Sequence, residues 1–150
     1  MPPDDGARPQ KLSIVVYSGD FDKVHYALAM ASAAVAVNLP ATLFFTMEAI
    51  RALATEGSDG TPGWHAMRTG AGEAAEQADA RFRGRGVATF GELLDACREL
   101  GAAFMVCEMG LRAIGMTMDE LRGDIAYREG GIVTFLNDAR AEAGMDPISG

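Results

Sequence analysis

Cys107 is the residue of this sequence with the clearest potential for chemistry. It follows an apolar run at 102–106 that predicts a buried strand, and a segment of helical character follows it. A thiol at the start of a helix faces free backbone N–H groups and the positive end of the helix dipole, which stabilise the nucleophilic thiolate. The alternative interpretation is that Cys107 is a small buried hydrophobic residue that only fills the core.

The second cysteine, Cys97, is predicted to lie on the apolar face of a helix and to be part of the core. The chain reverses at Gly101 before the strand that leads to Cys107. The two thiols should therefore lie near opposite ends of the sheet, beyond the reach of a disulfide. Any chemistry of Cys107 is then expected to proceed without a second cysteine from the same subunit.

Several polar and apolar side chains follow other predicted strands and could line a site with Cys107. Lys23 could place positive charge near a thiolate, although the acids around it also suit the capping of a helix. The candidate lining residues are Ser18, Gly19, Asp20, Lys23, Phe45, Thr46, Glu108 and Met109.

Other kinds of site receive little support from the sequence. His25 and His65 have no paired ligand spacing, so we expect no metal site. Gly19 belongs to neither a dinucleotide fingerprint nor a phosphate-binding loop, and we expect no cofactor. No nucleophile-elbow sequence for Ser–His–Asp catalysis is present.

The elements that position these residues alternate between strands and helices. Such alternation predicts the α/β class, with an open, mainly parallel sheet, helices on both faces and sites at the carboxyl ends of the strands. Strands are expected at 12–17, 41–46, 102–106 and 125–127, and helices at 22–38, 47–55, 89–100, 108–114, near 117–120 and at 131–143.

The chain is expected to form one domain over residues 12–143, preceded by a disordered lead-in at 1–11 and followed by a tail at 144–150. A glycine-rich segment at 56–86 is predicted to be an insertion with a short helix and to be the most mobile part of the chain. Trp64, Met67 and Phe82 give it apolar surface with which to dock. The terminal helix is expected to turn Ile132, Phe135 and Leu136 inward.

The net charge of −8 argues against nonspecific nucleic-acid binding and against a polybasic membrane contact. No apolar run is long enough to span a bilayer, and residues 1–11 lack the apolar core of a signal peptide. We therefore expect a cytoplasmic protein in which both cysteines are free thiols.

The sequence resembles the DsrE/DsrF-like family, and most closely the DsrE-type branch that is often labelled peroxiredoxin-like. The resemblance rests on KLSIVVYSGDFDK at 11–23, ATLFFT at 41–46, AFMVCEMGLRAIGMTMDEL at 103–121 and REGGIVTFLNDA at 128–139. Relatives typically continue after the cysteine in a C-x-M-S-M pattern, where this chain has Gly110-Leu111. The Pro/Thr-rich setting and arginine partner of a peroxidatic cysteine are not visible around Cys107.

The resemblance implies a flavodoxin-like or Rossmann-like three-layer sandwich that assembles as trimers or hexamers. It also implies a sulfur carrier or sulfurtransferase that holds sulfane sulfur as a persulfide on Cys107 and passes it from a donor protein to an acceptor thiol. The alternative is a noncatalytic oligomeric binding or accessory subunit, with a packed Cys107 and an apolar pocket lined by methionines.

Overall fold

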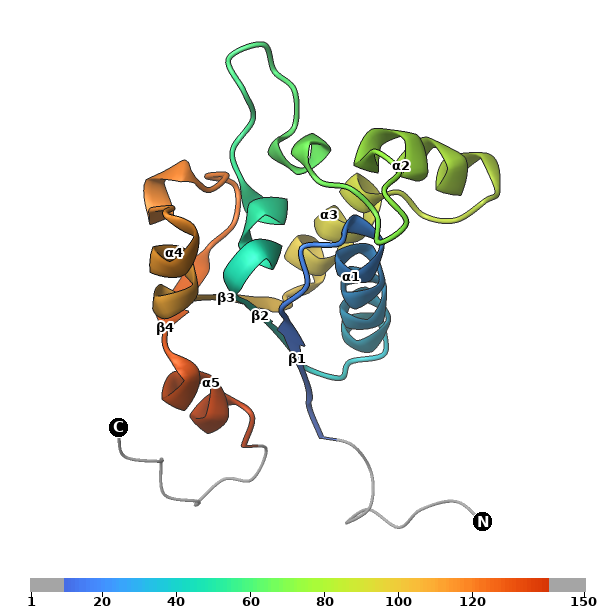
Figure 1. Cartoon of the computed structure of the whole chain (residues 1–150). Coiled ribbons are helices and arrows are strands. Elements are labelled where there is room, and N and C mark those ends of the chain that lie inside the picture. Colours follow the sequence, from blue (N-terminus) through green and yellow to red (C-terminus); the bar gives the residue numbers. More distant parts are fainter. Residues whose placement is uncertain (1–9, 141–150) are drawn as a thin grey trace.

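The computed structural model describes residues 10–140, and four parallel strands form one sheet at the centre of this part (Figure 1). The strands lie side by side in chain order and are β1 (Leu12–Val16), β2 (Ala41–Phe45), β3 (Ala103–Cys107) and β4 (Tyr127–Gly130). The helices are α1 (Phe21–Ala36), α2 (Ala75–Gly84), α3 (Phe90–Leu100), α4 (Glu108–Ile114) and α5 (Ile132–Asp138), with 3-10 turns η2 (Met47–Leu53), η3 (Gly63–Ala66) and η4 (Met118–Glu120).

The parallel three-layer α/β fold predicted from the sequence is confirmed. All three strand pairs are parallel, and β2 is buried along its whole length between β1 and β3. The last strand was predicted at 125–127 but pairs with β3 over 127–130. Its sequence, Tyr-Arg-Glu-Gly, has no apolar alternation that would mark it as a strand. It still forms one, because an edge strand can be held mainly by backbone hydrogen bonds. The predicted lead-in and tail fall largely or wholly outside the described residues.

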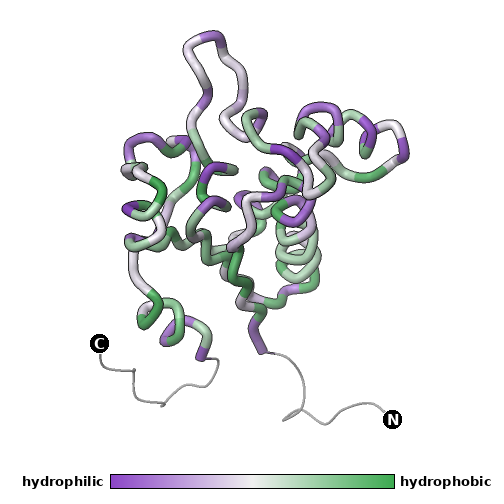
Figure 2. Tube along the Cα trace, viewed as in Figure 1, coloured by the Kyte–Doolittle hydropathy of each residue, from purple (hydrophilic) through white to green (hydrophobic). Residues whose placement is uncertain are grey.

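The main core lies between the sheet and the face that α1 and α3 cover. Consecutive strand order and right-handed crossovers place both connecting helices on the same face. Leu28 of α1 meets Cys97 of α3 there, and the inward side chains of the strands include Leu43 and Val106. Figure 2 shows the hydrophobic residues gathered in the sheet and the helices packed on it.

The opposite face of the sheet carries α5, which contacts side chains of β2 and β3. Phe135 of this helix stacks on Phe44, with ring centroids 4.6 Å apart, in a small second cluster. Ile132 and Leu136, which were expected to face inward, are 53% and 45% exposed. The expectation for these two residues was wrong, because a seven-residue helix over the sheet buries only one narrow stripe.

The segment 56–86 contacts the main core through its aromatic side chains. The indole of Trp64 stacks on Phe21, with ring centroids 5.2 Å apart, and lies 4.8 Å from the ring of Phe90. Met67 is buried as well. Residues 55–62 are exposed and form the loop that protrudes beyond η2 and η3 in Figure 1. The greater mobility of the segment stays a prediction, and these contacts favour the loop at 55–62 as its most mobile part.

Thr89 begins α3 with the capping box that its spacing from Glu92 predicts. The Thr89 hydroxyl accepts a hydrogen bond from the Glu92 amide, and the Glu92 carboxylate accepts one from the Thr89 amide at 2.9 Å. Replacing Thr89 by alanine should lower the free energy of unfolding by about 1 kcal/mol, because one first-turn donor loses its acceptor. Urea denaturation measures the loss, and an unchanged midpoint would contradict the role of this cap.

Candidate functional site

Cys107 is the last residue of β3 and the residue that precedes α4. Its backbone pairs with Gly130 at the end of β4, so both strands end beside it. The residue is 1% exposed and packs with Phe44, Met105 and Phe135 on the face of the sheet that α5 covers. The thiol therefore lies at the carboxyl ends of two strands, as predicted, but it is surrounded by apolar side chains.

A cavity of about 300 Å³ opens beside this cysteine. It is lined by Cys107, Met109, Gly131, Ile132, Val133 and Thr134. The last four residues form the beginning of α5, where the first N–H groups of a helix have no acceptor within the helix. The cavity thus places the Cys107 thiol beside mainly apolar walls and the first residues of α5.

Gly110 allows α4 to pack closely against the residues that follow β2. A Cβ atom at this position would lie 2.6 Å from the backbone nitrogen of Met47 and 2.6 Å from the Thr46 hydroxyl oxygen. Such distances are far below a van der Waals contact, so only glycine allows α4 to approach η2 this closely. The difference from the C-x-M-S-M pattern of the resembled family therefore coincides with a close backbone contact in this chain.

The residues after β1 lie with α1, on the face of the sheet opposite Cys107. The Lys23 ammonium group is 3.0 Å from the Asp20 carboxylate, and Ser18 accepts a hydrogen bond from the Asp20 amide. Asp20 precedes α1 but makes no side-chain cap. Gly19 packs against Glu48, whose Cβ would be 2.8 Å from a Cβ at position 19. None of these residues lines the cavity beside Cys107.

The other candidate residues divide between the core, the surface and the cavity. Phe45 is fully buried on the opposite face and stacks on Phe104. Thr46 is buried beside Gly110, and Glu108 is exposed. Met109, which is 52% exposed, is the one predicted lining residue that shares the cavity with Cys107.

Residues 131–134 belong to the cavity but were missed by sequence reasoning. The available signal was Gly130-Gly131, a glycine pair between a strand and a helix, at the level where β3 ends. A Cβ at position 130 would lie 2.7 Å from the Cβ of Thr134, so this glycine lets the helix turn back tightly over the strand end.

Cys97 differs from Cys107 in its surroundings. It is fully buried in the main core, and its thiol donates a hydrogen bond to the Leu28 carbonyl at 3.4 Å. Burial raises the pKa of Cys97 to about 11, so it stays protonated at neutral pH. Both cysteines are free thiols on opposite faces of the sheet, which confirms that they form no disulfide with each other.

The two histidines make structural contacts. His25 is buried and donates from Nε2 to the Ala88 carbonyl at 2.8 Å, while His65 packs edge-on against the Trp64 indole. Within residues 10–140, no group of three metal-ligating side chains comes together. In the same part of the chain, no helix combines the length and the apolar character needed to cross a membrane.

Comparison with known proteins identifies the fold. No protein-family model matches the chain, and no curated protein sequence matches it. The crystal structure of the ychN protein from E. coli is similar over 85% of this chain and 89% of that one, with a TM-score of 0.50 and 16% sequence identity. At this identity the likeness shows the fold alone, and it supports the DsrE-like fold that the sequence indicates.

Proposed function

We propose that this protein carries sulfane sulfur as a persulfide on Cys107 and relays it between partner thiols, as the resemblance to the DsrE/DsrF-like family implies. The Cys107 thiolate attacks the outer sulfur of a donor persulfide. The donor S–S bond breaks, the donor leaves as a thiolate, and a Cys107 persulfide forms. An acceptor thiolate then attacks the outer sulfur and releases Cys107, so the relay needs no external oxidant or reductant.

The observation that carries this proposal is the cavity that Cys107 lines. A persulfide adds one sulfur atom to the side chain, and the cavity of about 300 Å³ gives that atom a place beside the buried thiol. A resting thiol that is 1% exposed is also protected from general oxidants.

The proposal also covers the oligomeric state of the protein and its location in the cell. A homo-oligomer, a trimer or hexamer by the family resemblance, would cover apolar side chains that remain exposed around α5, including Ile132 and Leu136. Free thiols suit the reducing cytoplasm, where the sulfur donor and acceptor would also be located. The measurement for assembly is the mass in solution by light scattering.

A noncatalytic binding or accessory subunit is the second candidate function. It is favoured by the packing of Cys107 between Phe44, Met105 and Phe135, which is the environment of a structural cysteine. In this case the cavity beside Met109 would take a small apolar ligand or a partner side chain, and Cys107 would not be consumed or modified.

Incubation with a sulfane-sulfur donor followed by intact-mass measurement distinguishes the two functions. The wild-type chain is expected to gain the mass of one sulfur atom, and Cys107→Ser is expected to lose that gain completely. The matched control is Cys97→Ser, which should still be loaded because Cys97 is protonated and fully buried. A wild-type chain without the added mass would overturn the relay and favour the binding subunit.

A further inference from the structure

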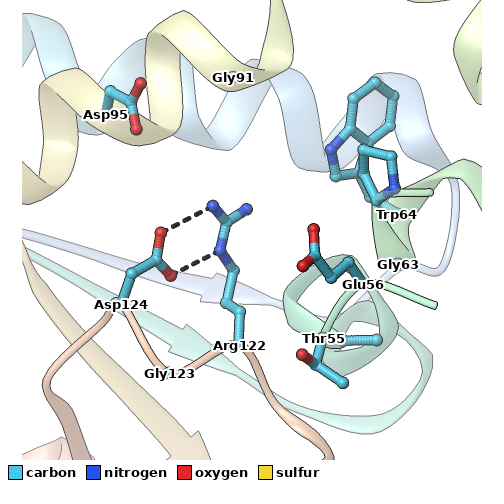
Figure 3. Close-up of a pocket in the computed structure, with 11 residues that line it drawn as sticks. Thr55, Glu56, Gly63, Trp64, Gly91, Asp95, Arg122, Gly123 and Asp124 are labelled. Atoms are coloured by element: carbon cyan, nitrogen blue, oxygen red, sulfur yellow. Dashed lines mark hydrogen bonds and ion pairs between the residues drawn. The ribbon is translucent and has the colours of Figure 1, made fainter. Parts of the chain in front are cut away.

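A second, larger cavity lies apart from Cys107, between α3, the segment after η2, η3 and the turn before β4. Its volume is about 490 Å³, within the range of roughly 300–1,000 Å³ that is typical of small-molecule sites. It is lined by Ala54, Thr55, Glu56, Pro62, Gly63, Trp64, Gly91, Asp95, Arg122, Gly123 and Asp124 (Figure 3). It shares no lining residue with the cavity at Cys107.

One side of this cavity presents hydrogen-bond donors. Trp64 lines the cavity, and its indole N–H faces into it in Figure 3 without a hydrogen bond to any acceptor in the described part of the chain. Arg122 uses Nε and Nη2 on Asp124, at 2.8 and 2.9 Å, and leaves Nη1 available. Gly91 lies in the first turn of the eleven-residue helix α3, where the amides of Phe90 and Glu92 already donate to Asp79 and Thr89, so the Gly91 amide is the first-turn donor left for a ligand among the described residues.

The carboxylates of the cavity leave one negative charge uncompensated. Asp124 pairs with Arg122, and Asp95 pairs with Arg98 at 2.8 Å. Among the described residues, no cation lies within ion-pair distance of the Glu56 carboxylate, which points into the cavity in Figure 3. A ligand that fits must therefore offer an acceptor to the Trp64 and Arg122 donors and a cationic group to Glu56.

We infer that this cavity binds a small zwitterion of the free amino acid class. Its carboxylate accepts hydrogen bonds from the Trp64 indole and the Arg122 guanidinium, and its ammonium group lies against Glu56. Gly91 leaves room for the ligand, because a Cβ at this position meets nothing within 4 Å. This site is independent of the persulfide relay and would make the protein responsive to a metabolite as well.

Tryptophan fluorescence tests the inference directly, because Trp64 is the single tryptophan of the chain. The full chain is titrated with a panel of free amino acids, with their N-acetyl derivatives and with the amines that lack the carboxylate. We expect a saturable change for at least one free amino acid, and at least tenfold weaker binding of its two derivatives, since each lacks one charged contact. Calorimetry provides a second readout that does not depend on fluorescence.

Variants test whether the signal comes from this cavity. Glu56→Gln, at an exposed position, should weaken binding about tenfold or more, and Gly91→Leu should abolish it by filling the space. The matched control is Gly84→Leu in α2, where a Cβ also meets nothing but the residue does not line this cavity; it should bind as the wild type does. Three results would each overturn the inference: no saturable binding of any free amino acid, equal binding of the N-acetyl form, and undiminished binding in Gly91→Leu.

Discussion

Replacing Gly110 by alanine is expected to lower the free energy of unfolding by about 3 kcal/mol. The added methyl group would lie 2.6 Å from the Met47 nitrogen, and a backbone atom cannot move aside as the end of a flexible side chain can. Relief of the clash requires α4 to shift away from η2, and α4 starts immediately after Cys107. Urea denaturation measures the loss, and the rate of thiol alkylation shows whether Cys107 becomes more accessible.

The matched control for this variant is Gly91→Ala. Gly91 is also helical, but a Cβ there meets nothing within 4 Å. Alanine should therefore raise the free energy of unfolding by about 0.5–1 kcal/mol through the helix propensity alone. Equal effects of the two substitutions would contradict the close contact between α4 and η2.

Replacing Asp138 by asparagine is expected to lower the free energy of unfolding at neutral pH by about 2–3 kcal/mol. The side chain is 8% exposed at the end of α5 and is the acceptor for three side chains. It accepts from the Thr42 hydroxyl at 2.6 Å, from Lys11 at 2.9 Å and from Arg128 at 2.6 Å. An asparagine removes the negative charge and leaves the ammonium of Lys11, itself only 18% exposed, with the carbonyl of residue 138 but without an opposite charge.

The Asp138 carboxylate is also expected to make the stability of the fold sensitive to acid. Burial would raise the pKa of Asp138, but the hydrogen bonds from Thr42, Lys11 and Arg128 outweigh it and lower the pKa to about 2. A lowered pKa stabilises the folded chain above the pKa of the unfolded state, near 4, and this stabilisation is lost as the pH falls from about 4 to 2. Urea midpoints measured across this range should fall less steeply in Asp138→Asn than in the wild type.

Glu73→Gln provides the control for Asp138→Asn. Glu73 pairs with Arg81 at 2.7 Å, but both side chains are more than 30% exposed. Such a surface pair contributes less than about 1 kcal/mol, so its loss should hardly change the urea midpoint at neutral pH. If Glu73→Gln lowered the free energy of unfolding as much as Asp138→Asn does, the burial of Asp138 and its partners would not explain the effect.

The sequence was sufficient to predict the parallel sheet, because its signals are local. The apolar runs that became β2 and β3, the capping box at Thr89 and the end of α3 at Gly101 can each be recognised within a few residues. Burial on both sides gives a central strand a continuous apolar sequence. The edge strand β4 was misplaced, since its Arg128 and Glu129 carry no such signal.

The candidate site could be predicted only in part, because side chains of one strand alternate between the two faces of the sheet. Phe45 and Cys107 both lie at strand ends, but Phe45 points to the α1 and α3 face and Cys107 to the α5 face. The sequence also does not reveal that residues 131–134 return to the end of β3, since that contact depends on the pairing of β4. The sequence therefore predicts which residues lie at strand ends, but it does not predict on which face of the sheet each of their side chains lies.

The attachment of α5 controls access to the second face of the sheet. This helix is held mainly by the ring of Phe135 and by the hydrogen bonds of Asp138, and it covers Met105 and Cys107. Detachment of α5 can therefore occur as a local opening, while α1 and α3 remain packed on the other face. The labelling rate of Cys107 in the native protein would then measure the free energy of this opening, and weakening the helix at Asp138 should accelerate labelling well below the denaturant concentration that unfolds the sheet.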